Sequence, residues 1–182
     1  MSARVIFGWK DASARLTAPV MAAALLLLAA CAGLRGPETS AGSAPGTTRY
    51  AVEGLSFEMP SAWRAGGSPR AVKLTHPEEI GVLDVTAVQQ RFADEKACLA
   101  AGTEALARGD RSFQNVRRHH STFGGRPAIT QEADQGAWHG WAWAVCDGGT
   151  QYRIFFSGRA PVAPDVIGAW RAFTKSARIA PR

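Results

Sequence analysis

Residues 138–157 read WHGWAWAVCDGGTQYRIFFS, which is two apolar, aromatic-rich runs, 138–146 and 151–157, separated by Asp147-Gly148-Gly149-Thr150. Runs of this length and composition are typical of strands. An Asp-Gly pair between two such runs favours the tight hairpin turns that require positive φ. This stretch therefore predicts an antiparallel hairpin.

Alternation along the first run separates its side chains into two groups, because successive residues of a strand point to opposite faces of a sheet. Trp141 and Trp143 share the face of His139 and Val145, and we expect them to be buried against the C-terminal helix. The opposite face has room for a close helix, since apart from Trp138 it carries only small residues. The alternative is that Trp138, Trp141 and Trp143 form an aromatic binding patch for a partner or an apolar ligand.

The rest of the chain supplies further strands and two helices. Apolar–polar alternation or β-branched composition predicts strands at 55–59, 71–75, 80–88, 113–123 and 127–133. An alanine-rich segment at 93–108, with Asp94 as its N-cap, predicts a helix. Val166, Trp170 and Phe173 form the apolar stripe of a second helix at 164–176. This order predicts an α+β fold, an antiparallel sheet of about six to seven strands covered by two helices in an α/β/α sandwich.

The N-terminal residues 1–30 read as an export signal. Arg4, Lys10 and Arg15 precede an apolar segment that is too short to span a bilayer. Leu25 to Leu28, Ala29 and Ala30 lead directly into Cys31, which resembles the lipobox of bacterial lipoproteins. In that family the signal is cut before the cysteine and the thiol is acylated. The alternative is an ordinary secretory signal with Cys31 a chance neighbour.

The resemblance implies a lipid-anchored protein of the cell envelope. Because Ala32, and not an aspartate, follows Cys31, it implies the outer membrane facing the periplasm if the organism is Gram-negative. Residues 31–49 are rich in glycine, proline, serine and threonine, which predicts a flexible tether carrying the acylated cysteine. The single folded domain is expected at 50–182.

Charge and cysteine content narrow the function classes. Residues 31–182 hold 18 bases and 14 acids, and the bases are scattered, so nucleic acid is not an expected partner. Cys98 and Cys146 are the two cysteines left after lipidation. An even number in an exported chain favours a disulfide between them. The alternative is two free thiols.

Three local motifs resemble the PsbP-like family, which includes PsbP of photosystem II, Mog-type Ran-binding proteins and envelope lipoproteins of the DcrB and LpqN type. Leu55-Ser56-Phe57-Glu58-Met59-Pro60-Ser61-Ala62-Trp63 is similar to the family's opening strand, proline and tryptophan. Gly125-Arg126-Pro127-Ala128 resembles the start of a mid-sheet strand, and 170–179 resembles the closing helix and final short strand. The resemblance spans about 50–180. It implies a binding or assembly module without shared catalytic residues.

Candidate chemistry is sparse. Adjacent His119 and His120 point to opposite faces of a strand and cannot both bind one ion, while His76 and His139 are isolated in sequence. No metal site, no cofactor and no catalytic residue is therefore predicted. The expected function is a non-catalytic binding or accessory subunit, anchored to the membrane and held to an unidentified protein partner. The alternatives are a carrier of apolar small molecules with a tryptophan-lined cleft, and a hydrolase with dispersed catalytic residues.

Overall fold

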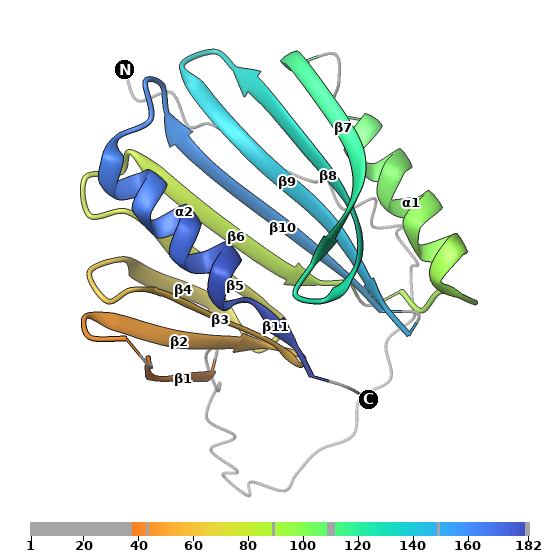
Figure 1. Ribbon diagram of the computed structural model, residues 1–182, viewed down its shortest axis with the longest axis horizontal. Helices are drawn as coiled ribbons and strands as arrows, with labels where there is room; N and C mark the ends of the chain where they lie inside the picture. The colour runs from red at the N-terminus through yellow and green to blue at the C-terminus, as the bar shows by residue number, and fades with distance from the viewer. Residues whose placement is uncertain (1–37, 43, 89, 109–111, 149, 181–182) are drawn as a thin grey trace, which may run out of the picture. The chain divides into compact units, whose positions relative to one another are not determined.

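Figure 1 shows the computed structural model, which describes residues 38–180 except 43, 89, 109–111 and 149. The expected signal at 1–30 and the expected lipidation site Cys31 lie outside the described residues. Within the described part, no helix is both long and apolar enough to cross a membrane.

A seven-stranded sheet forms the centre of the described fold. Its strand order is β4-β5-β6-β10-β9-β8-β7, and every neighbouring pair is antiparallel. The bounds are β4 (Arg64–Ser68), β5 (Ala71–Thr75), β6 (Gly81–Ala87), β7 (Gln114–Phe123), β8 (Arg126–Gln135), β9 (Trp138–Asp147) and β10 (Thr150–Arg159).

The hairpin predicted from 138–157 lies inside this sheet. Asp147 pairs with Thr150, so the turn between the strands begins at Gly148. Gly148 has φ +50°, which a tight turn of this kind requires. Because β8 and β6 flank the hairpin, both of its strands are interior to the sheet.

A second, four-stranded sheet was not predicted. It has the order β1-β2-β3-β11 and consists of β1 (Glu38–Ala41), β2 (Thr47–Val52), β3 (Leu55–Pro60) and β11 (Arg178–Ile179). The expected tether at 31–49 is therefore wrong for 38–41 and 47–49. Backbone hydrogen bonds between β1 and β2 hold this part of the chain, and they do not depend on large apolar side chains.

The two helices cover opposite faces of the seven-stranded sheet, as the α+β prediction requires. Helix α1 (Glu95–Ala107) begins at Asp94, whose side chain accepts a hydrogen bond from the backbone N–H of Ala97 at 2.7 Å. Helix α2 (Pro164–Ser176) has the predicted bounds. Figure 1 shows α2 in front of β6, and α1 beside β7.

We call the face under α2 the aromatic face. Trp143 and Val145 of β9 and the inward side chains of β10 meet α2 and β3 in the main core. Phe57 of β3 and Phe173 of α2 contact edge to face, with ring centroids 5.1 Å apart. The large, fully buried side chains here are Tyr152, Phe156, Phe57, Phe173, Leu55, Met59, Leu74 and Leu83.

We call the face under α1 the disulfide face. Its smaller core joins Leu106 of α1 to Ile129 and Ala144 of the sheet. A Cβ on Gly102 of α1 would lie 2.6 Å from the Cβ of Ala144. The helix is therefore seated so closely that only glycine fits at this contact.

Candidate functional site

The sheet brings together charged and aromatic residues that are separate in the sequence. At the end of the aromatic face, the register of β8 and β9 places Asp134 opposite His139 and Glu132 opposite Trp141. The tight turn at Gly136, with φ +58°, sets this register. A histidine that is isolated in the sequence therefore has two acidic neighbours in the fold.

His139 lies between the two carboxylates. Its Nδ1 is 2.6 Å from Asp134 Oδ1, and its Nε2 is 3.2 Å from Glu132 Oε1. The Asn115 amide donates a hydrogen bond to Asp134 at 2.7 Å. This bond, followed by the one from His139, holds the pKa of the Asp134 carboxyl below its usual range.

Beside this cluster, two indole rings stack between the sheet and α2. The ring centroids of Trp141 and Trp170 are 5.0 Å apart with planes at 27°. His139 meets Trp141 edge to face at 4.5 Å. Both tryptophans are partly exposed, and they border the main core. We call these five residues the Trp–His surface: Trp141, Trp170, His139, Glu132 and Asp134.

The indole N–H of Trp170 is buried and has no hydrogen-bond acceptor among the described residues. A buried donor without a partner costs about 1–3 kcal/mol. The Trp–His surface therefore contains a polar group that the described part of the fold leaves unsatisfied.

The alternative of a joint patch of Trp138, Trp141 and Trp143 does not match the structure. Trp143 is 6% exposed and packs between Phe123 and Phe173, at centroid distances of 5.2 and 6.1 Å. Trp138 lies on the disulfide face, because its position in β9 has the opposite parity. Both Trp141 and Trp143 contact α2, as predicted, but the expected burial is confirmed for Trp143 only, because Trp141 is partly exposed.

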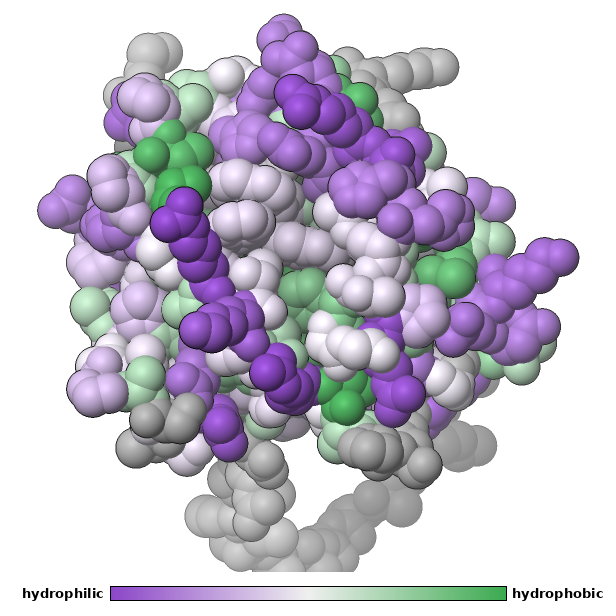
Figure 2. Space-filling view, in the orientation of Figure 1, coloured by the Kyte–Doolittle hydropathy of each residue, from purple (hydrophilic) through white to green (hydrophobic). Residues whose placement is uncertain are grey.

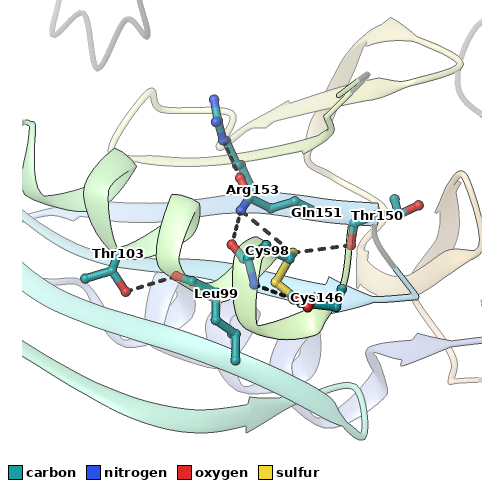
Figure 3. Close-up of a disulfide and its surroundings, with 9 residues drawn as sticks. Cys98, Leu99, Thr103, Cys146, Thr150, Gln151 and Arg153 are labelled. Atoms are coloured by element: carbon teal, nitrogen blue, oxygen red, sulfur yellow. Dashed lines mark hydrogen bonds between the residues drawn. A yellow bond between two sulfur atoms is a disulfide. The ribbon is translucent and has the colours of Figure 1, made fainter. Parts of the chain in front are cut away.

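The disulfide joins α1 to β9. Cys98 and Cys146 have Cα atoms 6.0 Å apart and bonded sulfurs, so the predicted pairing is present in the structure. Figure 3 shows the fully buried Gln151 beside this bond, donating to the backbone carbonyl of Cys98 at 2.9 Å. Arg153 Nε donates to the other end of the Gln151 amide at 2.9 Å. Sequence reasoning missed this polar support, because a glutamine within a strand carries no signal of burial.

His76 also has an acidic partner that is distant in the sequence. Its Nε2 lies 3.0 Å from Asp165 at the start of α2, and its Nδ1 accepts the backbone N–H of Glu78 at 3.1 Å. Trp63 contacts the imidazole ring edge to face. These contacts join the β5–β6 turn to α2.

Neither paired histidine is arranged for nucleophilic catalysis. A Ser–His–Asp triad needs one ring nitrogen on the carboxylate and the other on the hydroxyl of the nucleophile. Both nitrogens of His139 face carboxylates, and those of His76 are occupied by Asp165 and a backbone N–H. Two histidine–carboxylate pairs are thus present without the geometry of a triad.

The adjacent pair His119 and His120 is split between the two faces of β7. His119 pairs with Thr130, on the aromatic face. His120 lines a shallow depression between β7 and α1, together with Leu99, Ala100 and Thr103. In the part of the chain that the structure describes, no group of three histidine, cysteine or acidic side chains is placed to hold a metal ion.

Comparison with known proteins identifies the fold. No protein-family model matches the chain, and no curated protein matches it. The solution structure of cyanobacterial PsbP (CyanoP) from Synechocystis sp. PCC 6803 is similar, with a TM-score of 0.54 and 16% identity, over 78% of this chain and 98% of that one. A crystal structure from Bacteroides thetaiotaomicron VPI-5482 has a TM-score of 0.49 and 10% identity, over 71% of this chain. This chain spans 46% of the Bacteroides protein.

The cyanobacterial structure is matched over nearly its whole length, and the α+β class agrees with the two helices and two antiparallel sheets described above. An identity of 16% supports a statement about the fold and none about activity. The chain has the PsbP-like fold.

Proposed function

We propose that this protein is a lipid-anchored envelope protein that acts as a non-catalytic accessory subunit and binds a protein partner through the Trp–His surface. The observation that carries the proposal is the stacked pair Trp141 and Trp170, partly exposed at the border of the core. Aromatic anchors beside a polar rim are typical of binding surfaces. His139, Glu132 and Asp134 supply such a rim.

The anchoring half of the proposal rests on the sequence. The apolar run that ends in Ala29, Ala30 and Cys31 supports cleavage and acylation at Cys31. A disulfide between Cys98 and Cys146 fits an oxidising compartment outside the cytoplasm. If the organism has an outer membrane, Ala32 after the cysteine supports a location there, facing the periplasm.

The alternatives have less support. A carrier with a tryptophan-lined cleft needs the three indoles around one space, and Trp143 is instead core while Trp138 is on the other face. A hydrolase needs a histidine with one nitrogen facing a nucleophile, and both paired histidines have other contacts. A binding role therefore has more support than either alternative.

Photo-crosslinking in intact cells tests the binding half. A benzophenone amino acid replaces Trp170 in one variant and Trp138, on the opposite face, in the matched control. The expected result is a discrete crosslinked product from position 170, absent at 138 and weakened by Glu132→Gln with His139→Gln. Equal products from both positions, or none from either, would contradict a partner at this surface.

Mass spectrometry and fractionation test the anchoring half. The mature wild-type protein is expected to begin at Cys31 and to carry acyl chains, and Cys31→Ser is expected to block maturation. A mature N-terminus at another residue, without acyl chains, would overturn the anchor and leave the crosslinking result unaffected.

A further inference from the structure

A strip of positive charge follows the solvent side of α2 into β11. Arg171, Lys175 and Arg178 are all exposed, and the first two are one helical turn apart. Figure 2 shows strongly hydrophilic side chains along the course that α2 and β11 take in Figure 1. We call these three residues the basic ridge.

The basic ridge is not neutralised by nearby acids. The segment 166–179 contains no aspartate or glutamate. In the described part of the chain, no carboxylate forms an ion pair with any of the three side chains. Arg178 Nη1 instead donates to the backbone carbonyls of Lys175 and Ala177, at 2.9 and 2.7 Å.

The two acids at either end of this region already have partners. Glu58 of β3 lies 3.3 Å from Arg49, and Asp165 binds His76. The basic ridge therefore presents three positive charges together. Lys175 in the last turn and Arg178 at the end of α2 favour the C-terminus of the helix, whereas Arg171, one turn before Lys175, adds a like charge that weakens it slightly.

The basic ridge is close to the point where the chain leads toward Cys31. The order β1-β2-β3-β11 places Arg178 three strands from β1, which is about 14 Å at the usual strand spacing. Only residues 32–37 separate Cys31 from β1, and a chain of that length reaches at most about 25 Å. An acylated Cys31 would hold this sheet, and the basic ridge with it, near the membrane surface.

We propose that the basic ridge rests on anionic phospholipid headgroups of the membrane in which the protein is anchored. This rests on the proposed lipid anchor at Cys31. Electrostatic attraction acts within about 8 Å in physiological salt, a range that the short connection to Cys31 permits. The short connection also raises the effective concentration of headgroups at the basic ridge, so a weak attraction suffices to orient the domain.

Lysine acylation tests this orientation with the mature, lipidated protein. The protein is reconstituted in vesicles of phosphatidylcholine alone or with an equal part of phosphatidylglycerol, and treated with a water-soluble amine-reactive reagent. Lys73 on β5 and Lys96 on α1 are exposed and serve as internal controls away from the basic ridge. Mass spectrometry gives the modification rate of each lysine.

We expect Lys175 to react about tenfold more slowly on the anionic vesicles, and high salt to restore its rate. Lys73 and Lys96 are expected to react at similar rates on both. Arg171→Gln with Arg178→Gln, which retains Lys175 as reporter, is expected to lose most of the protection. The matched variant Arg108→Gln with Arg159→Gln is expected to keep it.

Equal rates for Lys175 on the two kinds of vesicle would overturn the proposal, as would equal protection of all three lysines. Protection of Lys175 in native membranes but not on anionic vesicles would also overturn it, in favour of an acidic protein. Flotation on phosphatidylcholine vesicles reports the anchor separately. A protein that floats without protecting Lys175 keeps its anchor and loses only the contact of the basic ridge.

Discussion

The two faces of the seven-stranded sheet are covered in opposite ways. On the aromatic face, Trp143 of the sheet packs against Phe173 of α2, which also contacts Phe57 of β3. On the disulfide face, α1 approaches through Gly102 and Ala144 and is joined covalently by Cys98 and Cys146. Helix α1, which has little apolar surface to bury, is therefore held by close backbone approach and one disulfide. Helix α2 is held instead by the apolar surface area that it buries.

The largest expected effect comes from breaking the aromatic core. Trp143→Ala removes a nearly buried indole between Phe123 and Phe173, and we expect it to lower the free energy of unfolding by about 3–5 kcal/mol. Urea unfolding measures this loss. The matched control Trp138→Ala, on the other face and partly exposed, is expected to lose less than half as much. Equal losses at the two positions would contradict the assignment of Trp143 to the core.

The disulfide is the next largest contribution. Cys98→Ala with Cys146→Ala opens a loop of 48 residues, and the chain-entropy model gives a loss of about 4 kcal/mol. We expect α1 to become the first part of the protein cut by a protease. An unchanged urea midpoint, or a first protease cut in α2, would contradict the conclusion that the disulfide stabilises the fold and holds α1.

Alanine substitutions at one glycine in each helix test how closely each helix approaches the sheet. Gly102→Ala places a methyl group 2.6 Å from the Cβ of Ala144, and we expect it to destabilise by about 1–3 kcal/mol, although alanine favours helix. Gly168→Ala in α2 meets no atom within 4 Å, and we expect it to stabilise by up to about 1 kcal/mol. Thermal unfolding of both variants would show opposite shifts. The same sign at both sites would mean that α1 is not seated tightly.

The smallest expected effects are changes in the pH dependence of stability, and they differ in sign between the two faces of the sheet. Burial raises the pKa of Asp84 on the disulfide face, so its ionisation costs stability at neutral pH. Asp84→Asn is expected to raise the free energy of unfolding at pH 7 by about 0.5 kcal/mol, with the gain vanishing in acid, where the wild-type carboxyl is protonated in both states.

The opposite sign is expected at Asp134 on the aromatic face. Hydrogen bonds from Asn115 and His139 lower its pKa, so it contributes stability above the ordinary carboxyl pKa, and this is lost as pH falls through its folded pKa. Asp134→Asn is expected to destabilise slightly at pH 7 and to change nothing in strong acid. Unfolding curves measured from neutral to acidic pH check both variants. A change in unfolding free energy of the same sign for Asp84→Asn and Asp134→Asn at pH 7 would contradict the opposite pKa shifts of the two carboxyls.

The elements that were predictable are those with strong side-chain patterns. The 138–157 hairpin follows from alternation and an Asp-Gly turn, and α2 follows from the stripe of Val166, Trp170 and Phe173. The missed strands lack such patterns. All five residues of β4 are exposed and β1 is held by backbone pairing, so apolar periodicity gives no signal for either. The two-residue β11 was expected only from the resemblance of 170–179 to a closing helix and final short strand.

The candidate site was predictable only in part. Trp141 was identified, and its contact with the C-terminal helix followed from strand alternation, although the side chain stays partly exposed. The acidic neighbours of His139 depend on the register across the turn at Gly136, which places Asp134 opposite the histidine. The sequence analysis did not predict this register. Trp170 of α2 reaches the site only through the packing of the helix on the sheet.

Hydrogen exchange on the protein lacking the disulfide tests the difference between the faces most directly. Amide protection in α1 and α2 is compared between the wild type and Cys98→Ala with Cys146→Ala. If α1 depends on the covalent bond and α2 on its aromatic core, protection in α1 is expected to fall by a much larger factor than protection in α2. A loss by the same factor in both helices would contradict this division, because it would mean that the two faces unfold as one unit.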